Sequence, residues 1–83
     1  MTPDNETSYL LDMKGLRCPV PVARTRKAIK KLPPGVRIKV ECTDPLADID
    51  IPHMVNTDGH SLLDKGVDGN AHWYLIQLKT SLD

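Results

Sequence analysis

The segment Val36–Cys42, with the sequence VRIKVEC, alternates apolar and charged residues along its whole length. A period of two places the apolar side chains on one face of a β-strand and the charged side chains on the other. Strands of this kind belong to sheets that are buried on one face and in contact with water on the other. We therefore expect a sheet with helices covering one of its faces.

A basic amphipathic helix is predicted before this strand. Between Pro19 or Pro21 and Leu32, apolar and small residues recur at helical spacing. The helix should end before the run Pro33–Gly35, because a proline ring cannot continue the hydrogen-bond ladder and glycine supplies the turn. The inward positions would be Val22, Thr25, Ala28, Ile29 and Leu32, with Arg24, Lys27 and Lys31 on the opposite side.

Four more elements are predicted in addition to this strand and the basic helix. A short strand over Tyr9–Asp12 begins the domain, and a short helix covers about residues 48–56. Strands over Ser61–Asp64 and Ala71–Lys79 follow, joined through the turn sequence Asp68–Asn70. The order βαβαββ predicts an α+β two-layer sandwich: a mixed four-stranded sheet with two helices on one face.

The length of 83 residues limits the chain to one domain. We expect a flexible polar N-terminus over residues 1–7 and a single domain over residues 8–83. Two cysteines are too few for a disulfide scaffold, and the first residues lack the features of a signal peptide. No apolar stretch approaches the ~18 residues that span a bilayer. We therefore expect a cytoplasmic monomer without direct membrane binding.

The charges of the chain are unevenly distributed although their sum is zero. Nine of the eleven basic residues fall within residues 13–40, which contain no acid. The other two, Lys65 and Lys79, share the rest of the chain with all eleven acids. This pattern predicts a basic surface around the first cysteine and acidic groups elsewhere.

Cys18 is a candidate reactive thiol because it lies between the first strand and the basic helix. A residue before proline avoids helical geometry, so Cys18 is predicted at the helix N-cap. The helix dipole, with Lys14 and Arg17, would lower the thiol pKa from ~8.5 to ~7. Prolines at 19 and 21 remove early amide donors, which leaves open an irregular first turn with a more exposed cysteine.

The surroundings of Cys18 narrow its chemistry. Thioredoxin-type cycling needs a second cysteine at C-x-x-C spacing, where this chain has Pro21. A cysteine protease needs a histidine base, and the chain has His53, His60 and His72. So small a domain, however, has few residues that could line a substrate pocket. A thiol that passes cargo between proteins fits better. Such a carrier performs half of a transferase reaction, so the sequence does not decide whether the protein is classified as an enzyme.

The stretch Leu11–Pro21 (LDMKGLRCPVP) resembles the signature of the TusA/SirA sulfur-carrier proteins, whose hallmark is C-P-x-P after an L-D-x-x-G-L lead. The likeness continues in Asp44-Pro45, in Asp50–Pro52 and in Gly59-His60. It covers about residues 9 to 79.

The resemblance implies a fold similar to the C-terminal domain of translation initiation factor 3. It also implies that Cys18 receives a persulfide sulfur from a cysteine desulfurase or rhodanese-like donor. The acceptors in this family serve tRNA thiolation, molybdenum cofactor synthesis or sulfur oxidation, and the resemblance does not choose among them. Beside the catalytic Cys18, the predicted loop-shaping residues are Gly15, Leu16, Pro19 and Pro21. The predicted partner-docking or thiolate-assisting residues are Lys14, Arg17, Arg24, Arg26, Lys27 and Lys30.

Two other functions remain open at this point: a non-catalytic regulatory module that binds RNA or protein through the basic helix, and a thiol-redox sensor. Direct nucleic-acid binding is disfavoured because the aromatic residues, Tyr9, Trp73 and Tyr74, do not interleave with the basic ones. Trp73 and Tyr74 should alternate between core and surface. Cys42 is expected to pack in the core, and a disulfide to Cys18 would be an artefact or a redox switch.

Neither a metal nor a cofactor is expected. The histidines and cysteines lack the C-x-x-C or H-x-x-x-H spacing of zinc ligands. The five glycines form no phosphate-binding loop.

Overall fold

Strands and helices follow one another in the order βαβαββ in the computed structural model of the protein, which describes residues 8–80. The predicted α+β architecture is thereby confirmed. The flexible N-terminus expected for residues 1–7, and the last residues of the chain, 81–83, lie outside the described residues. The elements are β2 (Ser8–Met13), α1 (Val20–Ile29), β3 (Arg37–Cys42), α2 (Ala47–Thr57), β4 (Ser61–Asp68) and β5 (Ala71–Gln77).

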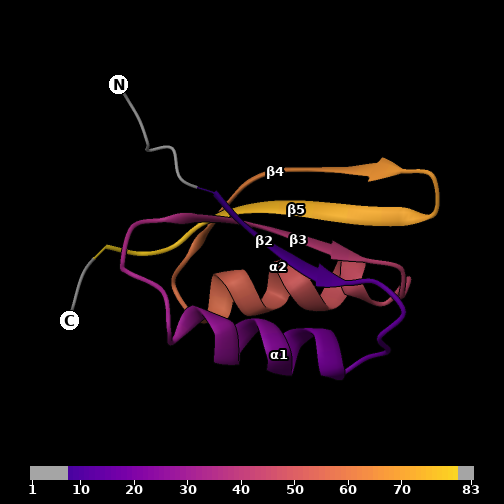
Figure 1. Ribbon diagram of the computed structural model, residues 1–83, viewed down its shortest axis with the longest axis horizontal. Coiled ribbons are helices and arrows are strands. Elements are labelled where there is room, and N and C mark those ends of the chain that lie inside the picture. Colours follow the sequence, from indigo (N-terminus) through magenta and orange to yellow (C-terminus); the bar gives the residue numbers. More distant parts are fainter. Residues whose placement is uncertain (1–7, 81–83) are drawn as a thin grey trace.

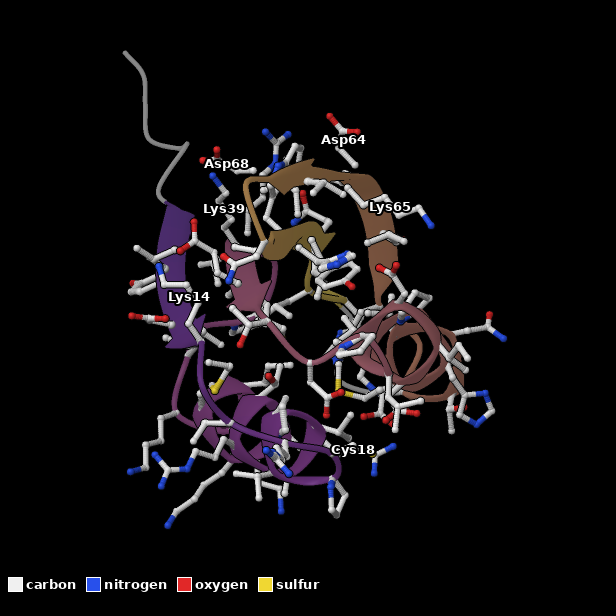
Figure 2. The ribbon with its side chains drawn as sticks, turned by 90° about the vertical axis from the view of Figure 1, so that its right-hand side faces the viewer. Lys14, Cys18, Lys39, Asp64, Lys65 and Asp68 are labelled. Atoms are coloured by element: carbon white, nitrogen blue, oxygen red, sulfur yellow. The ribbon has the colours of Figure 1, made fainter. Side chains whose placement is uncertain are left out.

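The sheet has the strand order β2-β3-β5-β4 and is mixed. β2 and β3 run parallel, whereas β3 pairs with β5, and β5 with β4, in antiparallel fashion. Parallel neighbours need a crossover connection, and α1 provides it between β2 and β3. Both helices lie on one side of the sheet (Figure 1). Lys39, Asp64 and Asp68 lie on the other side (Figure 2).

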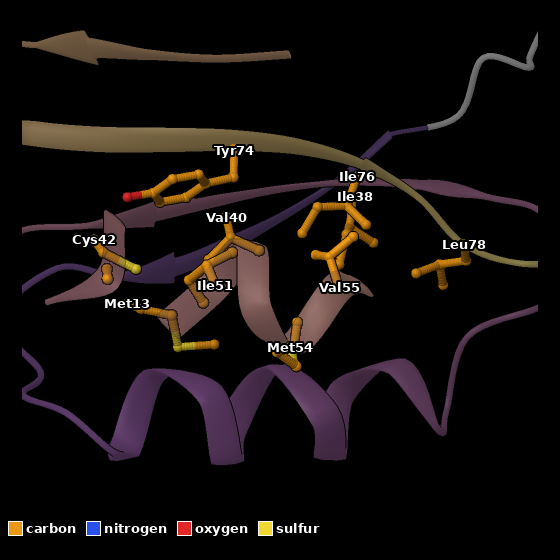
Figure 3. Packing of buried hydrophobic residues seen from close by; sticks show 11 residues of the cluster. Met13, Ile38, Val40, Cys42, Ile51, Met54, Val55, Tyr74, Ile76 and Leu78 are labelled. Carbon is orange, nitrogen blue, oxygen red and sulfur yellow. The ribbon is translucent and has the colours of Figure 1, made fainter. Parts of the chain in front are cut away.

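The core lies between the sheet and the two helices (Figure 3). β3 contributes Ile38, Val40 and Cys42, all fully buried, as its alternating sequence predicts. α2 adds Ile51 and Met54 from its inner face. The prediction that Cys42 is a packing residue is confirmed.

Trp73 and Tyr74 alternate as predicted, with Tyr74 buried and Trp73 half-buried on the outer face of the sheet. The indole of Trp73 lies against Gly66 in β4, where an added Cβ would approach the ring to 2.6 Å. The ammonium of Lys39 lies 5.2 Å from the ring centroid, a cation–π distance.

Three element ends differ from the sequence-based predictions by two residues or more. β5 ends at Gln77 instead of Lys79. β4 continues to Asp68 instead of ending at Asp64, because its pairing with β5 resumes after an irregularity between Leu62 and Asp64. α1 ends at Ile29 instead of Leu32. The amides that follow bond three residues back, Lys31 to Ala28 at 3.0 Å and Leu32 to Ile29 at 3.1 Å. This tighter turn ends the helix before the prolines.

The two helices have ten and eleven residues. Within residues 8–80, no helix is long and apolar enough to cross a membrane.

Candidate functional site

Cys18 lies in the loop between β2 and α1, exposed to solvent, at the end of the molecule where both helices begin (Figure 2). It is not the N-cap of α1, contrary to the prediction. The first helical bond runs from the amide of Ala23 to the carbonyl of Pro19, so Pro19 occupies the N-cap position and the helix has no side-chain cap. The irregular alternative, with an exposed cysteine, is the one that the structure shows.

Hydrogen bonds of the backbone amides shape the Cys18 loop. The amide of Leu16 bonds the carbonyl of Met13 at 3.1 Å, and the amide of Val20 bonds the carbonyl of Arg17 at 2.8 Å. Gly15 has φ of +85°, a conformation that glycine adopts without steric cost, and its amide bonds the hydroxyl of Thr43 at 2.9 Å. The peptide bond between Cys18 and Pro19 is cis.

Asp44 connects this loop to the beginning of α2. One carboxylate oxygen accepts the backbone N–H of Cys18 at 2.5 Å, and the other accepts the N–H of Leu46 at 3.0 Å. The pKa of Asp44 is lowered, mainly because these two amides stabilise the ionised carboxylate. The backbone of the cysteine is therefore held by a residue 26 positions away in the sequence.

Asp50, in the first turn of α2, contacts the thiol itself. Cys18 Sγ donates a hydrogen bond to Asp50 Oδ2 at 2.6 Å. The pKa of the Cys18 thiol is raised, first by this hydrogen bond, then by desolvation and by the charges of Asp50 and Asp44. This direction is opposite to the predicted one, because the thiol faces carboxylates and not the cations of its own loop.

The two cations expected to promote ionisation are engaged elsewhere. Lys14 Nζ lies 3.1 Å from Glu41 and 3.8 Å from Asp12, so it pairs with strand residues, and its pKa is raised mainly by the bond to Glu41. The charge of Arg17 contributes to the lowered pKa of Asp44. Neither is a hydrogen-bond partner of the Cys18 thiol, whose partner in the described residues is Asp50.

The basic residues of α1 differ in their surroundings. Arg26 forms a two-point contact with Asp58, at 2.8 and 3.1 Å. Among residues 8–80, no carboxylate lies within ion-pair distance of Arg24, Lys27 or Lys30. From Val20, Arg24 lies about 6 Å along the helix axis and Lys30 about 15 Å, so Arg24 is the closer of these two to the cysteine end.

Two open depressions are relevant to partner docking. The first, of about 570 Å³, adjoins the thiol, and the second, of about 590 Å³, runs along α1. The first is lined by Gly15, Leu16, Arg17, Cys18, Thr43, Asp44, Pro45 and Leu46. The second, which we call the α1 groove, is lined by Met13, Ala23, Arg24, Lys27, Ala28 and Lys31.

Asp44 and Asp50 were not predicted as site residues. The available signal was that both belong to the short stretches that resemble the TusA/SirA family, but sequence spacing does not show that they meet Cys18. Within residues 8–80, no group of three or more histidine, cysteine or acidic side chains is arranged to hold a metal ion.

Comparison with known proteins agrees with the resemblance to the TusA/SirA family. The family model described as "Sulfurtransferase TusA" matches residues 9–78. A protein of Bacillus subtilis (strain 168), described as "Putative sulfur carrier protein YrkI", is 38% identical over 72 residues, which cover 87% of this chain and 96% of the relative. The family match contains the Cys18 loop and both carboxylates that contact it. The chain therefore belongs to the TusA sulfurtransferase family.

Proposed function

We propose that this protein is a sulfur carrier in which Cys18 accepts a persulfide sulfur from a donor protein and passes it to an acceptor protein. The observation that carries the proposal is the exposed thiol of Cys18, held in a shaped loop, in a chain of the TusA family. Donor and acceptor both need access to the same sulfur atom, and an exposed position at the end of the molecule provides it.

The transfer is a thiol–persulfide exchange. The sulfur of Cys18 attacks the terminal sulfur of the donor persulfide, a new S–S bond forms, and the S–S bond of the donor breaks. The donor thiolate leaves with the bonding electron pair and takes up the proton that the Cys18 thiol loses. One thiol becomes a persulfide and one persulfide becomes a thiol, so no external oxidant or reductant is needed.

The carrier role requires that the loaded sulfur is not lost within the same chain. Cys42, the other cysteine, is fully buried, and burial raises its pKa to about 11. A buried, protonated thiol is a poor nucleophile, so it does not resolve the persulfide on Cys18. The sulfur then leaves by attack from an acceptor thiol that docks from outside.

The partner-docking surface is proposed to include the α1 groove. Its lining combines the buried Met13 and two alanines with the exposed Arg24, Lys27 and Lys31. A groove of this kind suits an acidic partner segment with an apolar contact, and its charge increases the encounter rate and the specificity. Exposed Val20, Leu46 and Ile49 add apolar surface at the cysteine end.

The identities of the partners follow from the family resemblance only. The proposed donors are pyridoxal-phosphate cysteine desulfurases or rhodanese-like proteins. The proposed acceptors serve tRNA thiolation, molybdenum cofactor synthesis or sulfur oxidation. No contact in residues 8–80 favours one of these pathways.

The proposal is tested by incubating the protein with a cysteine desulfurase and cysteine and then measuring its intact mass. We expect an added mass of sulfur that dithiothreitol removes and that is absent from Cys18→Ser. Cys42→Ala is the matched control and should load like the wild type. No adduct from desulfurase or rhodanese donors, or an adduct retained by Cys18→Ser, would overturn the proposal.

A further inference from the structure

We propose that Asp50 is a positioning residue that holds the thiol of the unloaded carrier in its protonated form and releases the sulfur once it has become a persulfide. The inference rests on the proposed carrier function and adds a second residue to its site. Asp50 lies 32 positions from Cys18 in the sequence and on a different element.

The geometry gives Asp50 a fixed place opposite the thiol. Its amide bonds the carbonyl of Leu46 at 2.9 Å, which places it in the first turn of α2, where the helix dipole stabilises a carboxylate. From there Oδ2 accepts a hydrogen bond from the Cys18 thiol, with 2.6 Å between Sγ and Oδ2. A hydrogen bond from a neutral donor to an ionised acceptor is stronger than one between neutral groups. The protonated thiol is therefore the favoured form.

Among the other charged groups around the pair, a second carboxylate reinforces this preference. Asp44, from the loop between β3 and α2, bonds the amide of Cys18 and adds a second negative charge. The charge of Arg17, in the cysteine loop, contributes to the lowered pKa of Asp44. Lys14, in the same loop, is paired with Glu41 of β3. The groups that face the thiol from α2 and from the β3–α2 loop are thus both acidic.

Loading reverses the interaction between Cys18 and Asp50. A persulfide is more acidic than the thiol from which it forms, so the loaded group is an anion without a proton to donate. Its hydrogen bond to Asp50 is lost, and the two like charges repel each other. The terminal sulfur is then directed away from α2, toward the open side of the site where an acceptor docks. The empty carrier resists unwanted thiol chemistry, and the loaded carrier presents its sulfur.

The test measures the alkylation rate of Cys18 by iodoacetamide as a function of pH, with the labelled cysteine identified by peptide mass. The proteins compared are the wild type, Asp50→Asn, Asp50→Ser and Asp50→Glu, with Asp68→Asn, at the end of β4, as the matched control. Circular dichroism confirms which variants are folded. Because no sulfur donor is present, a negative result here does not depend on whether the carrier can be loaded.

For Asp50→Asn and Asp50→Ser we expect the midpoint of the pH profile to fall by about one unit, with a lower plateau at high pH, because a less basic thiolate is less nucleophilic. About tenfold more thiolate, offset by about threefold lower nucleophilicity, gives an alkylation rate at pH 7 about threefold higher. Asp50→Glu should keep the midpoint closer to that of the wild type. A profile that is unchanged in a folded neutral variant, or that moves to higher pH, would overturn the proposal.

Discussion

The backbone N–H of Cys18 donates a 2.5 Å hydrogen bond to Asp44, and the same carboxylate accepts the N–H of Leu46 at the beginning of α2. One side chain thus fixes the position of the reactive residue relative to a helix that contributes to the site. The same helix carries Asp50, which accepts the hydrogen bond from the Cys18 thiol.

Removing the Asp44 carboxylate should therefore impair sulfur loading. Asp44→Ala leaves both amides without their acceptor, so we expect a severalfold lower loading rate and a thermal midpoint lower by a few degrees. Asp44→Asn keeps one acceptor oxygen and should give a smaller effect. The rate is measured by intact mass over time, with Asp64→Ala as the control. Loading by Asp44→Ala at the wild-type rate would show that the loop does not need this anchor.

Charge reversal in the α1 groove should slow the encounter with an acidic partner. We expect Arg24→Glu and Lys27→Glu each to reduce the rate of transfer severalfold at low ionic strength, because steering by charge acts on association. The wild-type rate should fall as salt is added, since ions screen these charges. Lys65→Glu, on β4 at the other edge of the sheet from β2, serves as the control. Rates that are indifferent to salt and to both reversals would exclude the α1 groove as a steering surface.

The contact of Trp73 with Gly66 makes a separate prediction about stability. An added Cβ at position 66 would lie 2.6 to 2.8 Å from three atoms of the indole, so the ring must move. We expect Gly66→Ala to lower the free energy of unfolding by about 1 to 3 kcal/mol, as for overpacked sites. Urea unfolding measures this change, and the emission of Trp73, the single tryptophan, reports the ring displacement. Val67→Ala, at an exposed neighbour, should be nearly neutral, and equal effects of the two substitutions would contradict the packing role.

The carboxylates near the site predict a dependence of stability on pH. The pKa values of Asp44 and Asp48 are lowered, Asp44 mainly by its amide donors and Asp48 mainly by the hydroxyl of Tyr74, which donates at 2.5 Å. A lowered pKa in the folded state means that the unfolded chain binds more protons. The stabilisation is therefore present above the unfolded pKa of about 3.9 and is lost as the pH falls through the lower folded values.

We expect the urea midpoint to fall, through these groups, as the pH drops below about 4. Asp48→Asn should reduce the steepness of this fall, whereas Asp68→Asn should leave it unchanged. A midpoint that rises on acidification below pH 4, or a fall that is equally steep in Asp48→Asn, would contradict the assignment.

Much of the fold could be predicted because local patterns agree with it. The alternation in Val36–Cys42 corresponds to β3, with its buried apolar face, and the helical spacing after Pro19 corresponds to α1. The turn at Gly69, with φ of +65°, joins two paired strands as the Asp-Gly sequence indicates. The end of β4 could not be predicted, because a glycine such as Gly66 weakens a strand pattern. Only the folded structure shows that Trp73, on the next strand, packs against it.

The site was predictable only in part. Cys18 stands out through its sequence neighbours and through the family resemblance. Its real chemical environment comes from Asp44 and Asp50, which tertiary folding brings to the thiol from distant positions. The sequence also places Lys14 close to the thiol, but the structure pairs it with Glu41 on a neighbouring strand. The prediction of a lowered thiol pKa, which was based on proximity along the chain, is therefore wrong.

The position of the transferred sulfur tests the carrier role most directly. The protein is loaded by a cysteine desulfurase with isotopically labelled cysteine, capped with an alkylating reagent and digested, and the peptides are read by mass spectrometry. The carrier role predicts labelled sulfane sulfur on the peptide that contains Cys18, none on the peptide that contains Cys42, and complete loss after dithiothreitol. Label on Cys42, or none on Cys18 with desulfurase and rhodanese donors alike, would contradict it.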